Sequence, residues 1–157
     1  MLVIPAAGSG SRLKADLPKF AVPVAGRPMA QWLFERYAPW VSGIVLVVSP
    51  AGLPHARAIA TGAPCEVRLA VQSHPTGMLD AVLLAREAVA ASAGRDVWIT
   101  WCDQIAVSRH TVSALANLSA THPDAWMVLP TVTRPDPYIH FDRDRAGRIT
   151  AVRHRRE

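Results

Sequence analysis

Short apolar runs alternate along the chain with segments in which apolar residues recur at helical spacing. The runs have the length typical of strands, and the one at 44–49 is of the continuous apolar kind expected in a strand covered on both faces. Two later runs flank a polar turn and predict a strand pair. The predicted strands are residues 2–5, 44–49, 66–71, 96–101 and 125–130, with the pair at 138–142 and 149–154.

Four segments between these runs are predicted to be helices: residues 28–40, 53–61, 77–91 and 108–118. Segment 77–91 has the clearest helical pattern, with Met78, Val82, Ala85 and Val89 predicted to lie on one buried face. Ser108 is a suitable N-cap for the last helix.

The alternation of strands and helices predicts an α/β fold of the three-layer α/β/α, doubly wound kind, with a mostly parallel, Rossmann-like sheet. Ligands bind such sheets at the carboxyl ends of the strands. The 157 residues suit one domain, and no linker or repeat divides them. Because the last predicted strand has no helix after it to cover it, we expect residues 1–157 to be the front part of a longer catalytic domain.

Composition narrows the class of protein. Half of the residues are hydrophobic and 18% are charged, which is a globular balance. The first apolar stretch is too short for a membrane span or signal peptide, so we expect a cytoplasmic protein without a membrane partner. Cys65 and Cys102 are isolated, so we expect packed thiols and neither a disulfide nor a cysteine-bound metal. The six histidines do not cluster at metal-ligand spacing.

The net charge of +5 suits either a nucleic-acid partner or a phosphate-rich small substrate. Arginines crowd the C-terminal end without the interleaved aromatic residues that stack bases, at positions 143, 145, 148, 153, 155 and 156. A phosphate-rich small substrate explains such charge as well as a nucleic acid does. We therefore expect no nucleic-acid partner, and RNA binding is the alternative ranked last.

The loop at residues 5–19 carries the most specific chemistry. Small residues and two glycines let the backbone approach a ligand and point N–H groups at phosphate oxygens, while Arg12 and Lys19 supply positive charge. No Gly-Lys-Ser/Thr follows, so the loop is not a Walker A loop. Leu13 stands where a Rossmann fingerprint has its third glycine.

The order Ala-Ala-Gly-x-Gly-x-Arg followed by Pro-Lys resembles the signature of the nucleotidyltransferase superfamily, of the sugar-1-phosphate nucleotidyltransferase or MobA-like type. The resemblance implies that Arg12 and Lys19 hold the triphosphate and act in catalysis. It also implies that Ala6, Ala7 and Gly8 lie beside the base and ribose. The nucleotide-binding loop then continues through Ser9, Gly10 and Ser11.

A second segment, residues 72–81, is similar to the Gln-x-x-Pro-x-Gly-x-x-x-Ala segment of sugar-phosphate nucleotidyltransferases. The resemblance implies that Gln72 and Gly77 read the base, with Pro75 and Thr76 in the same nucleotide-binding loop. An amide offers a donor and an acceptor together, which suits a pyrimidine edge. Taken alone, this segment is equally well read as a loop before a helix.

A third segment, the strand end Trp-Ile-Thr-Trp-Cys102-Asp103-Gln104, resembles the family strand that ends in Gly-Asp. The resemblance implies that Asp103 binds Mg²⁺ between the phosphates. A hard cation prefers carboxylate oxygen, and a strand end is a rigid place to hold one. Cys102 replaces the usual glycine and is expected to tighten the space.

The strand pair near the end is the loosest match. It resembles the pair that borders the sugar pocket, but Ile139 stands where the family has glycine, and His154 or Arg155 stands near the family's glutamate. No counterpart of a second metal-binding Asp or Asn is assigned before Glu157. These departures leave the identity of the sugar open.

Together the motifs predict an enzyme that transfers a nucleotidyl group from an NTP to a phosphorylated small molecule, first of all a sugar 1-phosphate, with Mg²⁺ as cofactor. A cytidylyltransferase for a non-sugar phosphate, a molybdopterin-type transferase and a non-catalytic nucleotide-binding domain remain alternatives. Homo-oligomerisation is also left open.

Overall fold

The computed structural model describes residues 1–8, 16–94 and 96–155. The chain divides into two compact units, Met1–Pro123 and Asp124–Glu157, and each is described by itself. In the described segments, no helix combines the length and hydrophobicity needed to cross a bilayer. The expectation that residues 1–157 form a single catalytic domain remains a prediction.

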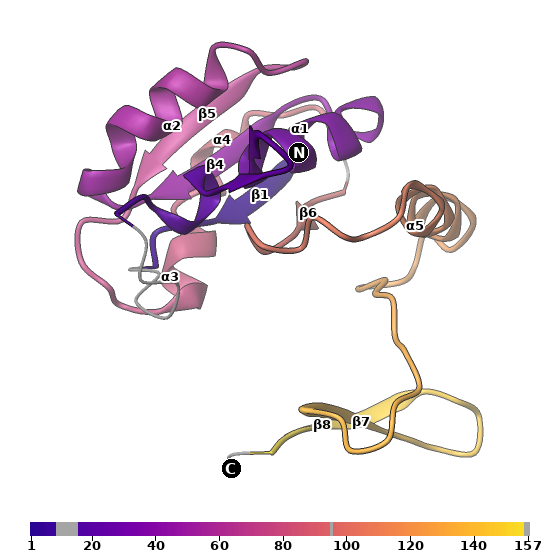
Figure 1. Ribbon diagram of the computed structural model, residues 1–157. Helices are drawn as coiled ribbons and strands as arrows, with labels where there is room; N and C mark the ends of the chain where they lie inside the picture. Colours follow the sequence, from indigo (N-terminus) through magenta and orange to yellow (C-terminus); the bar gives the residue numbers. More distant parts are fainter. Residues whose placement is uncertain (9–15, 95, 156–157) are drawn as a thin grey trace. The chain divides into compact units, whose positions relative to one another are not determined.

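The first unit is built on a parallel sheet with strand order β5-β4-β1-β6 (Figure 1). Its strands are β1 (Leu2–Pro5), β4 (Ile44–Val48), β5 (Val67–Val71) and β6 (Trp98–Ile99). Leu2 lies opposite Ile44 on one side and Trp98 on the other, so β1 is central. The predicted α/β class and parallel sheet are confirmed.

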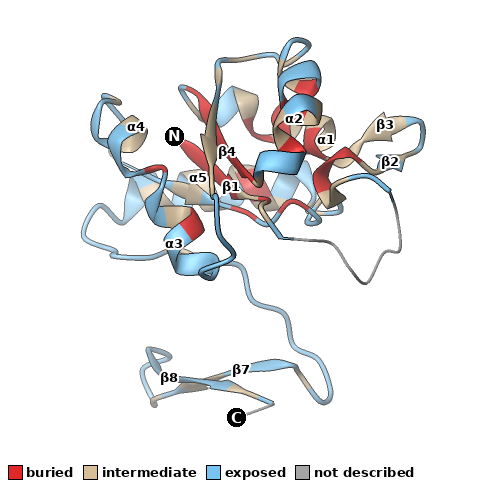
Figure 2. Ribbon diagram, turned by 90° about the vertical axis from the view of Figure 1, so that its left-hand side faces the viewer, coloured by how far each residue is buried: buried red, intermediate tan, exposed pale blue. Residues whose placement is uncertain are grey.

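Strands β1 and β4 are largely buried (Figure 2), and side chains on the two faces of the sheet belong to two different core clusters. All five residues of β4 are buried, which explains its continuous apolar run. Ile44, Leu46 and Val48 pack with α1 (Met29–Tyr37), α2 (Leu53–Ala60) and α5 (Arg109–Thr121). Val45 and Val47 pack with the alanines of the segment between β5 and β6. Helices therefore cover both faces, as a three-layer fold requires.

A small antiparallel ribbon precedes α1. It pairs β2 (Pro23–Val24) with β3 (Arg27–Pro28) across a turn in which Ala25 and Gly26 have φ of 50° and 78°. The 3-10 turn η2 (Lys19–Ala21) comes just before this ribbon. Helix α1 gives way to the 3-10 turn η3 (Ala38–Trp40), earlier than the predicted end at residue 40, because a proline interior to a helix breaks it. A further 3-10 turn, η4 (Pro50–Gly52), leads into α2.

The prediction of one long helix at residues 77–91 is wrong in its continuity and in part of its buried face. It is broken into α3 (Met78–Leu83) and α4 (Arg86–Ala90). Ala81 and Ala85 are the buried residues, whereas Met78 is 52% exposed. Val89 is half-buried and packs against the same cluster, so Ala85 and Val89 of the predicted face do meet the core, whereas Met78 does not.

Two predicted strands are shorter or absent. The strand at residues 96–101 is reduced to Trp98–Ile99, which pairs with β1 on one side. Residues 125–130 form no strand, and Trp126 is fully exposed. An apolar run becomes a strand only where a neighbour accepts its backbone hydrogen bonds. None of the residues that the structure describes pairs with 125–130.

The predicted cap of α5 is confirmed, since Ser108 Oγ accepts a hydrogen bond from Thr111 N at 3.0 Å. The helix runs three residues past its predicted end, to Thr121.

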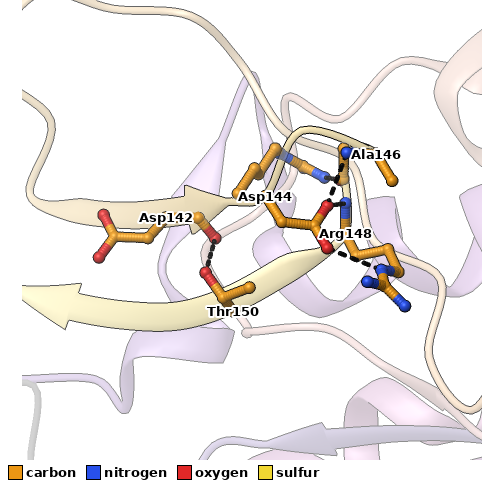
Figure 3. Close-up of polar contacts among 7 residues, drawn as sticks. Asp142, Asp144, Ala146, Arg148 and Thr150 are labelled. Carbon is orange, nitrogen blue, oxygen red and sulfur yellow. Dashed lines mark hydrogen bonds and ion pairs between the residues drawn. The ribbon is translucent and has the colours of Figure 1, made fainter.

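In the second unit, β7 (Ile139–Arg143) and β8 (Ile149–His154) form the predicted antiparallel pair. Figure 3 shows the Asp144 carboxylate closing its turn by accepting hydrogen bonds from Ala146 N and Arg148 N, both at 2.9 Å. Thr150 Oγ1 joins the strands by donating to Asp142 O at 3.2 Å.

Candidate functional site

The topology of the sheet marks one edge as a ligand site. From β1 the chain moves outward to β4 and β5, then returns to the other side of β1 as β6. The connections on the two sides of β1 lie on opposite faces, so the carboxyl ends of β1 and β6 flank a topological switch point. The segments that leave these ends are residues 6–8 and 100–103, which contain four of the predicted site residues: Ala6, Ala7, Gly8 and Asp103.

The first segment is held to the sheet by its backbone. Ala6 is buried and its N–H donates to Val47 O at 2.7 Å, whereas Gly8 is exposed. Ala7 lies between them and is half-buried. The chain therefore leaves β1 in a fixed direction toward the edge. Four of the predicted residues of this loop, Ser9, Gly10, Ser11 and Arg12, lie outside the described residues.

Lys19 returns to the same edge because of its neighbours in η2. Phe20 is fully buried and Ala21 is 7% exposed, both in the core cluster below α1 and α2. The backbone turn is closed by Ala21 N, which donates to Pro18 O at 2.8 Å. The buried phenyl ring thus fixes the backbone of Lys19, while the lysine side chain remains 34% exposed.

The central contact of the site joins Lys19 to Asp103. Lys19 Nζ lies 2.5 Å from Asp103 Oδ2, across 84 positions of sequence. The Asp103 side chain is 41% exposed, so both charges can be reached by a solute. The structure therefore brings together the two described members of the predicted catalytic set.

The turn that carries Asp103 is ordered by a residue whose part the sequence did not reveal. Gln104 Oε1 accepts hydrogen bonds from Thr100 Oγ1 at 3.0 Å and from Trp101 N at 3.4 Å. Gln104 N in turn donates to Trp101 O at 3.0 Å. In the sequence, the only sign of this role was the position of Gln104 directly after Asp103. The hydrogen bonds of its side chain to Thr100 and Trp101 become visible only in the structure.

Cys102 anchors the same turn to the hydrophobic core. Its side chain is 7% exposed and belongs to the core cluster, so it fills the interior instead of narrowing the ligand edge. Burial, with the neighbouring Asp103 charge adding to it, raises the pKa of the Cys102 thiol to about 11. The thiol is therefore a packing group, as the sequence predicted.

The predicted base-reading segment follows β5 at the same edge of the sheet. Gln72 N donates to Val48 O at 2.9 Å, which extends the sheet by one hydrogen bond. The Gln72 side chain folds over its own loop, and Nε2 donates to Thr76 Oγ1 at 3.2 Å and to Gly77 O at 3.0 Å. Because a carbonyl can only accept, Gly77 fixes which end of the amide faces it, and Oε1 is left to meet a ligand. Pro75 is exposed in this loop.

Gly77 has a backbone conformation that its residue type permits. Its φ is 115°, in the region that other residues rarely adopt, and it precedes α3 directly. This conformation places the Gly77 carbonyl within reach of Gln72, so the glycine is needed for the turn whatever its part in binding.

Neighbouring strands lie about 4.8 Å apart, so the ends of β5 and β6 are separated by roughly 14 Å across β4 and β1. An extended nucleotide can therefore reach from the Gln72 loop to the Lys19 and Asp103 side chains. One small cavity of about 80 Å³ lies elsewhere, lined by residues from β3, α1 and the segment after α2, and shares no residue with this edge.

The donor set at this edge suits a hard cation only together with a ligand. No group of three or more His, Cys, Asp or Glu side chains suitable for a metal occurs in the part of the chain that the structure describes. Mg²⁺ is commonly held by one or two carboxylates plus substrate phosphates and waters. The Asp103 carboxylate fits that arrangement.

Comparisons with known proteins point to the same chemistry. The sequence profile of the MobA-like NTP transferase domain matches residues 2–157. The bifunctional protein GlmU of Burkholderia mallei (strain SAVP1) is 31% identical over 153 residues, which cover 96% of this chain and 32% of that protein. The GlmU proteins of Burkholderia pseudomallei (strain 668) and Burkholderia thailandensis match to the same extent. The chain thus spans about a third of the length of these curated relatives.

A solved structure is similar in fold. CMP:2-keto-3-deoxy-manno-octonic acid synthetase, in complex with CTP, matches with a TM-score of 0.58 over 78% of this chain and 48% of that one. The sequence identity is 19%, so the likeness concerns the fold. It agrees with the α/β nucleotidyltransferase architecture.

Proposed function

Because the chain belongs to the family of MobA-like NTP transferase domains, we propose that it transfers the nucleotidyl group of an NTP to a sugar 1-phosphate, with release of pyrophosphate. The observation that carries the proposal is the Lys19–Asp103 pair at the switch point of the sheet. It combines an ammonium for phosphate oxygens with a carboxylate for a metal at the edge where α/β sheets bind ligands.

The reaction needs positioning and charge neutralisation more than acid–base chemistry. A phosphate oxygen of the acceptor attacks the α-phosphorus, the bond from that phosphorus to the bridging oxygen breaks, and pyrophosphate leaves with the electron pair. The attacking phosphate is already ionised, so no general base is required. Fixed positive charge near the phosphates lowers the barrier to such transfers.

Lys19 supplies that charge from a fixed backbone. Its ammonium sits on a turn held by the buried Phe20, so it stays at the edge while the side chain adjusts to the phosphate chain. Arg12 is proposed to act with it, on the strength of the sequence motif.

Asp103 is proposed to hold Mg²⁺ together with phosphate oxygens. When bound, the ion would neutralise charge on the triphosphate and the departing pyrophosphate. The Gln104 hydrogen bonds and the buried Cys102 fix the turn that presents the carboxylate. Such anchoring is what a precise ligand position needs.

Base recognition is assigned to the loop after β5. The Gln72 amide is held by Thr76 and Gly77, leaving its oxygen to accept a hydrogen bond from a base. A sugar 1-phosphate is preferred as acceptor because residues 72–81 resemble the sugar-phosphate branch and because GlmU matches over 96% of the chain. The fold neighbour in complex with CTP makes a cytidylyltransferase the second candidate.

A pyrophosphate-release screen tests the proposal. The full chain is incubated with Mg²⁺ and each of four NTPs, against a panel of sugar 1-phosphates and choline phosphate. Release with a sugar 1-phosphate is expected, and release with choline phosphate and CTP alone would favour the second candidate.

Two variants link the activity to the site. Lys19→Met and Asp103→Asn are each expected to lower turnover by about a hundredfold or more, as loss of an electrostatic stabiliser does. Arg57→Met and Glu87→Gln are matched controls, because both residues are exposed on helices and neither lies in a segment assigned to the site. Near-normal turnover in Lys19→Met and Asp103→Asn would refute the assignment.

A further inference from the structure

We infer that Lys19 and Asp103 act as a latch that couples metal binding to nucleotide binding, each group blocking the other until a metal–nucleotide complex displaces both. This inference rests on the proposed function of the same two residues.

The contact itself is the first argument. The Lys19 ammonium and the Asp103 carboxylate lie 2.5 Å apart and pair directly with each other. Within the described residues, neither side chain forms another ion pair. In this structure the group proposed for the triphosphate and the group proposed for the metal therefore neutralise each other.

The anchoring of the two turns is the second argument. Phe20 is fully buried directly after Lys19, and Cys102 is 7% exposed directly before Asp103. Both backbones are thus fixed in the core, and the pair can separate only by rotation of its side chains. The flexible four-carbon stem of lysine allows that movement, and the 34% and 41% exposure leaves room for it.

The charges of the pair determine how a metal ion and a nucleotide affect each other's affinity. A free divalent cation meets a carboxylate that is already neutralised and has an ammonium beside it. A free triphosphate meets an ammonium that is neutralised by a carboxylate. A metal–nucleotide complex replaces one ion pair by two, so metal and nucleotide should each strengthen binding of the other, and thermodynamic linkage makes the two effects equal.

The latch makes a prediction opposite to that of a simple binding site. Removing the Lys19 charge should raise the affinity for a metal ion alone, although the same change weakens nucleotide binding. Removing the Asp103 charge should raise the affinity for an NTP in the absence of metal. For a pair with this exposure, each gain is expected to be about 1.4- to 5-fold, the range found for exposed ion pairs.

The experiment measures binding and not turnover. Free Mn²⁺ is titrated with the full chain and followed by electron paramagnetic resonance, with no nucleotide present, for wild type, Lys19→Met and the control Arg57→Met. Binding of UTP and CTP is measured by calorimetry in excess EDTA for wild type, Asp103→Asn and the control Glu87→Gln. Circular dichroism checks that each variant is folded.

A gain in Mn²⁺ affinity for Lys19→Met, or a gain in metal-free NTP affinity for Asp103→Asn, supports the latch when the matching control stays at wild type. The two arms are independent, so loss of folding in one variant leaves the other decisive. Unchanged or weaker binding in both arms overturns the latch. If wild type releases pyrophosphate in that case, the latch alone has failed, whereas gains without any pyrophosphate release would refute the proposed function instead.

Discussion

Phe20 links the hydrophobic core to the candidate site, and its truncation tests that link. The phenyl ring is fully buried in the cluster formed with α1 and α2. Phe20→Ala removes this burial and leaves a cavity, which costs about 3–5 kcal/mol. Domains of this kind are stable by about 5–15 kcal/mol, so the variant should still fold. At about 2–4 °C per kcal/mol, the expected fall in Tm is about 6–20 °C.

The same change should weaken the site. Lys19 directly precedes Phe20, and the turn is otherwise held by the small buried Ala21 and by backbone hydrogen bonds such as that from Ala21 N to Pro18 O. Without the ring, the Lys19 ammonium loses its fixed position, and pyrophosphate release should fall by on the order of tenfold, because displacement of a charged group by about 1 Å is costly in catalysis. Phe20→Leu keeps most of the burial and should retain most of the activity.

Urea unfolding followed by tryptophan fluorescence gives the stability change, and pyrophosphate release is measured well below the unfolding midpoint. Leu17→Ala is the matched control, because Leu17 is 40% exposed and its loss should cost less than about 0.5 kcal/mol. A cost below about 1 kcal/mol for Phe20→Ala would refute the packing argument. Full activity in the folded variant would refute the link to Lys19.

Three further predictions concern other parts of the chain. Thr76→Val removes one of the two acceptors that hold the Gln72 amide and should raise the KM for NTP several-fold with kcat nearly unchanged; a change confined to kcat would contradict the base-reading role. Iodoacetamide at pH 8 should alkylate Cys102 far more slowly in the folded chain than in urea, since burial raises its pKa to about 11, and equal rates would contradict that burial. Asp144 has a pKa below its ordinary value of 3.8, mainly because Arg148 N donates to its carboxylate, so its contribution to the turn is complete above about pH 4 and is lost as the pH falls through the lowered value. NMR titration of the carboxyl carbon should therefore give a midpoint below 3.8, and a midpoint above it would contradict the hydrogen bonds of the turn.

Local pattern was enough to predict the parallel sheet. The run at residues 44–48 is apolar at every position because helices cover both faces, and the structure confirms this as β4. The Ser108 cap and the pair β7 and β8 follow from equally local signals. Each of these features depends on neighbours along the chain or on one adjacent strand.

The sequence pattern did not predict packing between distant parts of the chain. The helix at residues 77–91 is broken and buries Ala81 and Ala85, because close approach to the sheet favours small side chains over large apolar ones. Residues 125–130 have the composition of a strand but lack a pairing partner among the described residues. Strand formation depends on that partner as well as on the run itself.

For the candidate site, too, the sequence predicted the residues but not the contacts between them. The loop motifs pointed to Lys19, Gln72 and Asp103 because particular side chains are needed at particular loop positions. The hydrogen bonds that organise them have no sequence signature. Examples are the bond from Trp101 N to the Gln104 amide oxygen and the bond from the Gln72 amide nitrogen to Gly77 O. The direct pairing of Lys19 with Asp103, 84 positions apart, also required the fold.

The central claim is that this edge of the sheet grips the phosphates of a metal-bound nucleotide. Backbone NMR of the isotope-labelled chain, titrated with Mn²⁺ and an NTP, tests it most directly, because the paramagnetic ion broadens the signals of amides close to it. We expect the strongest broadening at Gly8, Lys19 and Asp103. Strongest broadening at the cavity near Arg27 and Glu35, or in the β7–β8 hairpin, would contradict the account.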